Sequence, residues 1–317
     1  MNKNTRRILG RKIGLFFLRL FVSITGSVPL RLNYFIGYFL GSIFYLVVPH
    51  YRKVASQSLN VAFPYKTIKE RKNIAKSSIK LMVCSVIETI YFLKNQYRLN
   101  NVRIEGRQYL EEALKQNKGV IGFTAHFGNF PLMDLKLAKE NYPVSVILRP
   151  IRDPRTGEHI YDMCVQGGVK TILSYPREEV VSKTIKALRN NELVIVQMDQ
   201  NFGTGGVWVD FFGKLAATPV GPIVFALRTK AVILPIYIIR EGMGKHCIKI
   251  LEPYNLEKAS DTRETVLLNA AKITKIIEGW IKENPEQWFW IHSRWKSRPS
   301  DIVKKAKFKI YSKALAQ

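Results

Sequence analysis

At the centre of the chain stands Val120-Ile-Gly-Phe-Thr-Ala-His-Phe-Gly-Asn-Phe130, and the fold class can be argued outward from it. Its first five residues form a short apolar run, which is typical of a buried β-strand. Gly128 permits a tight turn or a close approach of the backbone to a ligand, and Asn129 is a good cap for a following helix. The segment therefore predicts a strand, a tight turn and a helix start, with His126 exposed at the turn.

Similar apolar runs recur further along the chain and are separated by helical patterns. The runs are Val144–Leu148, Leu193–Met198 and Val232–Ile239, and the helical patterns include Glu178–Asn190 and Val220–Thr229. Short buried strands that alternate with helices predict an α/β fold, a single domain whose mostly buried central sheet is flanked by helices. Upstream, Thr67-Ile-Lys-Glu70 has the pattern of a capping box and predicts a helix that continues to about Phe92.

Polar residues follow three of these runs: His126, Arg149 and Asp199. In open α/β sheets, ligands bind beyond the carboxyl ends of the strands, so we expect the three side chains to open onto one cleft. A neutral histidine is the natural general base for a hydroxyl near pH 7. Arg149 is expected to hold a phosphate or a carbonyl oxygen; a surface ion pair is the alternative.

The charge balance points to an anionic partner. The 317 residues include 50 Lys+Arg and 24 Asp+Glu, a formal net charge of +26. Nucleic acid, an acidic membrane and an acidic protein or substrate are the candidates. The sequence contains no zinc-finger spacing and no RNA-recognition signature, so we expect no nucleic-acid partner. Three cysteines without a CxxC pair argue against disulfides and structural zinc.

The N-terminal part has a different character from the rest. Two apolar stretches, 13–30 and 34–48, follow a basic N-terminus, and neither is a clean uncharged span. They predict either an interfacial or single-pass membrane anchor or a pair of helices packed on the domain. We divide the chain into a membrane-associated helical segment (1–50), the α/β domain (51–300) and a basic tail (301–317).

Four blocks carry a resemblance to a known family. His126-Phe-Gly-Asn-Phe130 resembles the central motif of the late acyltransferases of lipid A biosynthesis, the lauroyl/myristoyl transferases within the lysophospholipid acyltransferase superfamily. Further blocks are similar in order and spacing: Asp199–Gly203, Val209–Gly213 with Ala216–Pro219, and Pro285–Lys296. The resemblance extends from about Phe16 to Pro299.

The resemblance implies transfer of a fatty acyl chain from an acyl-carrier-protein thioester to a hydroxyl of a lipid A-type glycolipid precursor, with His126 as general base. It implies no covalent enzyme intermediate, metal or organic cofactor. The expected partners are acyl carrier protein, the anionic glycolipid and the membrane, at the cytoplasmic face of a bacterial inner membrane. The residues expected to bind substrate are Gly128, Asn129, Arg149, Asp199, Phe211 and Phe212, the last two in an acyl tunnel.

The central motif departs from the family at one position. The family has an acidic residue where this chain has Pro131, which suits the first turn of a helix but cannot orient an imidazole. Asp134, on nearly the same helical face, is expected to substitute for that acid; Asp199 is the other possible partner of His126. A non-catalytic, lipid-binding homologue of the same fold is the alternative function.

The C-terminal block also allows two interpretations. Its aromatic and basic residues, Trp288, Trp290 and Trp295 with Arg294 and Lys296, predict either an interfacial patch or an element packed on the sheet. His292 lies within the same block and is expected to be structural.

Overall fold

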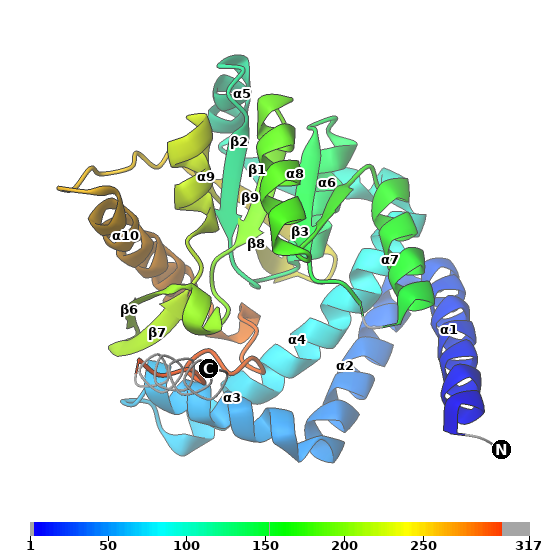
Figure 1. Cartoon of the computed structure of the whole chain (residues 1–317). Coiled ribbons are helices and arrows are strands. Elements are labelled where there is room, and N and C mark those ends of the chain that lie inside the picture. Colours follow the sequence, from blue (N-terminus) through cyan, green and yellow to red (C-terminus); the bar gives the residue numbers. More distant parts are fainter. Residues whose placement is uncertain (1–2, 152, 300–317) are drawn as a thin grey trace, which may run out of the picture.

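A computed structural model describes residues 3–151 and 153–299, and the predicted basic tail (301–317) lies outside them. Its centre is a seven-stranded sheet in the order β1-β9-β8-β2-β5-β3-β4 (Figure 1). The strands are β1 (Val102–Glu105), β2 (Val120–Thr124), β3 (Val144–Leu148), β4 (Lys170–Leu173), β5 (Leu193–Gln197), β8 (Val232–Gly242) and β9 (Lys245–Ile250). All neighbouring strands are parallel except β8 and β9, which form an antiparallel pair.

The sheet is buried on both faces because side chains alternate along each strand. In β2, Ile121 and Phe123 belong to one hydrophobic cluster and Val120 to the other. The flanking helices are α5 (Arg107–Lys115), α6 (Phe130–Lys139), α7 (Pro154–Gln166), α8 (Arg177–Arg189), α9 (Gly221–Thr229) and α10 (Thr262–Glu283). The predicted α/β class with a central, mostly buried sheet is confirmed.

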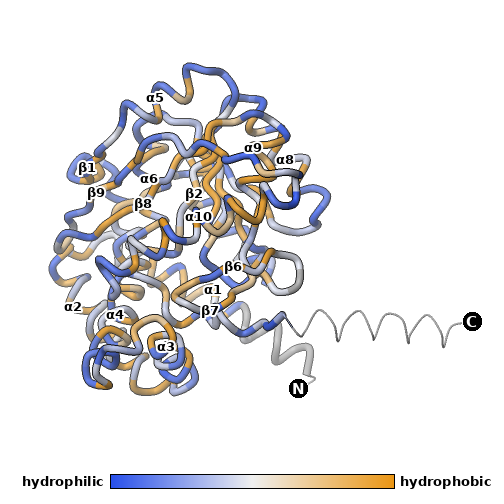
Figure 2. The backbone as a smooth tube through the Cα atoms, turned by 90° about the vertical axis from the view of Figure 1, so that its left-hand side faces the viewer, coloured by the Kyte–Doolittle hydropathy of each residue, from blue (hydrophilic) through white to orange (hydrophobic). Residues whose placement is uncertain are grey.

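The N-terminal helices gather at the carboxyl ends of the central strands (Figure 1). They are α1 (Lys3–Ser27), α2 (Leu30–Val47), α3 (Pro49–Ala62) and α4 (Ile68–Lys94). The predicted capping box is present at α4: the Thr67 hydroxyl accepts from the Glu70 N–H, and the Glu70 carboxylate accepts from the Thr67 N–H. In Figure 2 the hydrophobic segments run through the sheet and continue into the end of the molecule that holds α3 and α4.

Helix α2 packs against α4 through one face only. Its buried residues are Asn33, Tyr34, Gly37 and Gly41. Large apolar side chains on the rest of the helix are exposed, Phe35 by 70% and Phe39 by 58%. Among the described helices, α2 alone has the length and apolar composition of a membrane span. One face therefore fits the packed-helix interpretation, while the exposed face has the character expected of a helix that contacts a membrane.

A small hairpin, β6 (Val207–Phe211) and β7 (Lys214–Thr218), lies outside the main sheet and packs on α10. The C-terminal block packs against this region. Trp288 is 1% exposed, while Trp290 and Arg294 are fully buried. The Arg294 guanidinium donates to the carbonyl of Ala217 and the hydroxyl of Thr218, both in β7. The packed interpretation of this block is thus confirmed for these three residues, and the interfacial patch is wrong for them.

Candidate active site

His126 lies just beyond the carboxyl end of β2, and Asp199 just beyond the end of β5. These strands are parallel neighbours whose last residues, Thr124 and Gln197, are in register. The ring Nδ1 of His126 is 2.8 Å from Asp199 Oδ1, and the backbone N–H of His126 donates to Asp199 Oδ2 at 2.9 Å. The sheet therefore brings two of the three predicted strand-end residues into direct contact.

Asp199 is buried and fully engaged. The indole N–H of Trp288 donates to its Oδ2 at 2.7 Å. Burial alone raises the pKa of a carboxyl, but the charge of a protonated His126 ring and the hydrogen bonds from His126 and Trp288 hold the pKa of Asp199 below its usual value. An ionised carboxylate on Nδ1 keeps the ring proton on that nitrogen, so Nε2 carries the lone pair when the imidazole is neutral.

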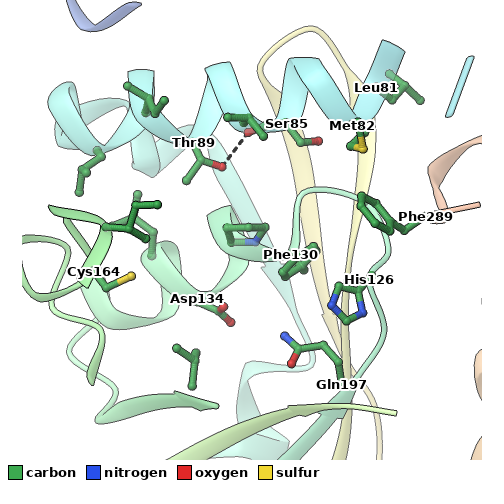
Figure 3. A pocket seen from close by; sticks show the side chains of 18 of the residues that line it. Leu81, Met82, Ser85, Thr89, His126, Phe130, Asp134, Cys164, Gln197 and Phe289 are labelled. Carbon is green, nitrogen blue, oxygen red and sulfur yellow. Dashed lines mark hydrogen bonds between the residues drawn. The ribbon is translucent and has the colours of Figure 1, made fainter. Parts of the chain in front are cut away.

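Next to His126 lies a cavity of about 390 Å³ (Figure 3). The His126 side chain is 21% exposed, and no hydrogen bond joins its Nε2 to another described residue. The cavity is almost entirely apolar. Its walls come from α1, α4, α6, α7 and the strand ends, including Leu18, Val22, Leu81, Met82, Val86, Ile90, Phe130, Leu135, Leu148, Ile160 and Phe289.

Gly128 shapes the turn after His126. Its φ is +58°, and a Cβ at this position would lie 2.1 Å from the carbonyl oxygen of Ile238, so a larger residue would force the backbones apart. The C-terminal block holds the same turn: Gly128 N–H donates to the Gln287 carbonyl at 2.8 Å, and Phe289 N–H to the His126 carbonyl at 3.1 Å. Gly128 also lines the cavity.

Asn129 is fully buried and uses its side chain within the protein. Its Oδ1 caps α6 by accepting from Leu132 N–H at 3.3 Å, and its Nδ2 donates to Glu88 at 2.9 Å. The predicted cap is confirmed. Asn129 therefore fixes the start of α6, three residues after His126, and the structure places no part of it in the cavity lining.

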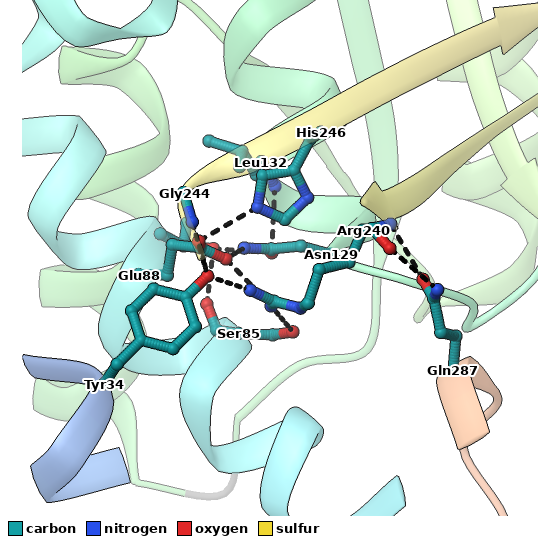
Figure 4. A network of polar contacts seen from close by, with 10 residues as sticks. Tyr34, Ser85, Glu88, Asn129, Leu132, Arg240, Gly244, His246 and Gln287 are labelled. Atoms are coloured by element: carbon teal, nitrogen blue, oxygen red, sulfur yellow. Dashed lines mark hydrogen bonds and ion pairs between the residues drawn. The ribbon is translucent and has the colours of Figure 1, made fainter. Parts of the chain in front are cut away.

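Glu88 is the centre of a buried polar network that the sequence analysis did not identify (Figure 4). Its carboxylate lies 2.8 Å from Arg240 and 2.9 Å from the His246 ring, and it accepts from Tyr34. Burial tends to raise the pKa of Glu88, but His246 and the Arg240 charge lower it to about 2. One signal was available: Glu88 is a lone acid within the apolar pattern of α4.

Three further predicted site residues are, like Asn129, absent from the described cavity lining. Arg149 is exposed after the end of β3 and is not part of the described cavity lining. Phe211 is buried behind Trp288, with 5.7 Å between the ring centroids, and Phe212 packs on Phe63. The lining made by described residues contains neither phenylalanine. The single cleft expected for the three strand-end residues is therefore not found. His126 lines the cavity, whereas Asp199 is buried behind it as its hydrogen-bond partner and Arg149 is exposed outside the lining.

Asp134 and Pro131 both line the cavity. Pro131 occupies the first turn of α6, as predicted. Asp134 is 7% exposed, its Oδ1 has no hydrogen-bond partner, and no hydrogen bond joins it to His126 within the described chain. Burial without a partner raises the pKa of Asp134 well above its usual range. His292, which was expected to be structural, accepts a hydrogen bond from Asn201 N–H at 3.0 Å.

Comparisons with known proteins agree with the sequence motifs. A family model described as bacterial lipid A biosynthesis acyltransferase matches residues 1–297. The lipid A biosynthesis lauroyltransferase of Escherichia coli (strain K12) is 24% identical over 280 residues, covering 87% of this chain and 89% of that protein. The palmitoleoyltransferase of the same strain is 24% identical over 277 residues, covering 86% and 88%. A phosphatidylinositol mannoside acyltransferase of Mycobacterium tuberculosis (strain ATCC 25618 / H37Rv) is 29% identical over 162 residues, covering 50% of each chain.

Proposed function

Because the chain belongs to the bacterial lipid A biosynthesis acyltransferase family, and is an acyltransferase, we propose that it moves a fatty acyl chain from an acyl-carrier-protein thioester to a hydroxyl of a lipid A-type glycolipid precursor. One observation carries this proposal: the His126–Asp199 pair stands at the wall of an apolar cavity, with Nε2 of the ring unpaired among the described residues.

In this mechanism His126 is the general base. The acceptor hydroxyl attacks the thioester carbonyl while Nε2 removes its proton, so a C–O bond forms as the proton leaves. Asp199 holds Nδ1–H and stabilises the imidazolium that results. When the C–S bond breaks, the imidazolium returns the proton to the leaving thiolate. The reaction needs no covalent enzyme intermediate, and the proton passes through one side chain only.

The cavity supports binding of the acyl chain. Burial of apolar surface contributes about 0.8 kcal/mol for each CH₂ group, so a long acyl chain gains much from the apolar walls around His126. Leu18 and Val22 of α1 form part of this wall, which makes the N-terminal helix a component of the substrate site. Gly128, at the turn that carries His126, lets the backbone approach the substrate closely.

The surface properties support the other partners of the proposal. A net charge of +26 favours an acidic carrier protein, an anionic glycolipid and an acidic membrane leaflet. The exposed apolar face of α2 is suited to contact with lipid. We therefore propose that the protein works at the cytoplasmic face of a bacterial inner membrane. Arg149, exposed beyond β3, is a candidate contact for the glycolipid phosphate.

The non-catalytic alternative was motivated by the missing acid at Pro131. Asp199 contacts His126 through the nitrogen that such an acid would be expected to hold. The missing acid is therefore a weaker argument against catalysis, and the enzymatic function is the better supported conclusion.

The proposal is tested by mixing the purified protein with acyl carrier proteins loaded with saturated chains of several lengths and a lipid A precursor, and by recording the product masses. We expect one acyl group to be added and His126→Ala to abolish most of the transfer. A wild-type protein that binds the loaded carrier and the glycolipid but adds no acyl group would leave only the lipid-binding role.

A further inference from the structure

The acyl cavity contains a buried carboxyl group that the proposed reaction does not use. Asp134 lies on α6 with its carboxyl directed into the cavity, between Cys164 and Gln197 in Figure 3. The residue is 7% exposed and its Oδ1 has no hydrogen-bond partner. A buried polar group without a hydrogen-bond partner costs free energy. Its presence in an apolar wall therefore indicates a ligand that supplies the missing hydrogen bond.

The hydroxyl groups of the cavity wall, in contrast, form hydrogen bonds within the protein. Ser78 donates to the carbonyl of Trp288 at 2.6 Å, Thr89 donates to the Asn129 side chain at 2.8 Å, and Ser85 accepts from Arg240 at 2.9 Å. A buried water usually needs two to four polar partners. Besides Asp134, the lining there offers the Gln197 amide, and most of the surrounding wall is apolar, so a trapped water is poorly held.

The protonation state of the carboxyl restricts the ligand. Burial raises the pKa of Asp134 well above its usual range, which favours the neutral acid. A neutral carboxylic acid donates through its O–H and accepts through its other oxygen. A hydroxyl group also donates and accepts once each, and it carries no charge into the apolar cavity. The lining around Asp134 suits a hydrocarbon chain, so the fitting ligand is a chain that bears a hydroxyl.

We propose that Asp134 is a specificity residue that selects a hydroxylated acyl chain as the group bound in the cavity, by exchanging hydrogen bonds with the hydroxyl. This inference rests on the proposed function, because the cavity is taken as the site of the transferred chain. His126 and Asp199 carry out the transfer, whereas Asp134 binds the acyl chain at a position away from the reacting carbonyl. An unsubstituted chain leaves the carboxyl unpaired and binds more weakly.

Direct binding tests the inference without relying on turnover. The wild-type protein is titrated with a long saturated fatty acid and with its monohydroxylated counterparts, one for each position along the chain, by displacement of a fluorescent fatty acid. We expect at least one hydroxylated acid to bind about 10-fold more tightly than the plain acid, since 10-fold corresponds to about 1.4 kcal/mol. Asp134→Leu should remove this difference, and Asp134→Asn should retain part of it, because an amide still forms hydrogen bonds.

Two controls separate selection from folding and from general effects on the cavity. Met82→Leu changes an apolar side chain of the same cavity at similar volume and should leave the ratio of the two affinities unchanged. The melting temperature of Asp134→Leu should not fall, since the variant removes an unpaired polar group. Equal wild-type affinity for plain and hydroxylated acids, or an unchanged preference in Asp134→Leu, would overturn the inference.

The outcome is distinguishable from failure of the proposed function. Transfer of acyl groups by a wild-type protein that shows no binding preference overturns the role of Asp134 alone. If the protein transfers no acyl group but shows a binding preference that Asp134→Leu abolishes, the selective cavity is supported and the proposed acyltransferase function is overturned.

Discussion

The carboxylate of Asp199 contacts His126 twice, at the backbone N–H (2.9 Å) and at ring Nδ1 (2.8 Å), although 73 positions separate the two residues. This pairing follows from the register of β2 and β5. The orientation of the ring is therefore fixed by the sheet and does not depend on an acid in α6. Each member of the pair makes a distinct experimental prediction.

Replacing His126 by alanine should reduce kcat/KM for acyl transfer by about 100- to 10,000-fold, the usual contribution of general acid–base catalysis. Initial rates with a loaded acyl carrier protein measure the effect. His50→Ala, at an exposed position of α3, is the matched control and should retain wild-type activity. Similar losses in both variants would contradict a specific role for His126.

Asp199→Asn should reduce kcat more than it changes KM, because the amide no longer stabilises the imidazolium or fixes the ring tautomer. The same variant should lower the free energy of unfolding by roughly 1–3 kcal/mol at neutral pH, since a buried hydrogen-bonding group is altered. Steady-state kinetics and urea unfolding measure the two effects. An unchanged kcat would remove Asp199 from the mechanism.

The stability difference between the wild type and Asp199→Asn should depend on pH. The folded-state pKa of Asp199 lies below its unfolded value of about 3.9, so its contribution is fully present above that pH and is lost as pH falls through the folded pKa. Urea titrations from pH 7 downward should show the two proteins converging in acid. A difference that grows as the pH falls would contradict this linkage.

Pro131→Glu should not raise activity above the wild type, because Asp199 already occupies Nδ1 of His126 and a new carboxylate would enter an apolar wall. Pro131→Gln is the control for shape without charge. In the Asp199→Asn background, Pro131→Glu should restore part of the lost kcat if the new acid reaches the ring. Strong activation of the otherwise wild-type protein would show that Asp199 does not serve as the orienting acid.

Glu88→Gln should destabilise the fold by about 3–5 kcal/mol, because it leaves Arg240 with an uncompensated buried charge. Chemical unfolding measures the change. The control is Glu179→Gln, which breaks an exposed pair with Lys183 and should cost at most about 1 kcal/mol. Equal small effects in both variants would contradict a stabilising role of the buried Glu88–Arg240 pair.

Membrane binding should weaken when the exposed face of α2 is made polar. The double variant Phe35→Ser and Phe39→Ser should float less with anionic vesicles, while Val165→Ser, a residue 66% exposed on α7, should not. High salt should weaken only the electrostatic part of the binding. These substitutions are preferable to deletion of the N-terminal helices, since Tyr34 contacts Glu88 and Val22 lines the cavity. Full vesicle binding by the double variant would place the contact elsewhere.

The sequence by itself located part of the secondary structure and indicated the chemistry of the family. Apolar runs located β2, β3 and β5 because buried strands have continuous hydrophobic character. Local hydrogen-bonding patterns located the cap of α4 and the Asn129 cap of α6, since both involve residues only three positions apart. The four motif blocks together were sufficient to indicate the family, which the match over residues 1–297 confirms.

Tertiary structure decided which side chains meet. Helical spacing in the sequence made Asp134 a candidate partner for His126, but the neighbouring strand supplies Asp199. Arg149 is exposed beyond the end of β3, and Phe211 is buried against Trp288 outside the described cavity lining. Such contacts join residues far apart in the chain, and they depend on sheet order and on the space left between packed layers. Local sequence patterns determine neither of these, because they report only the neighbours within one helix or strand.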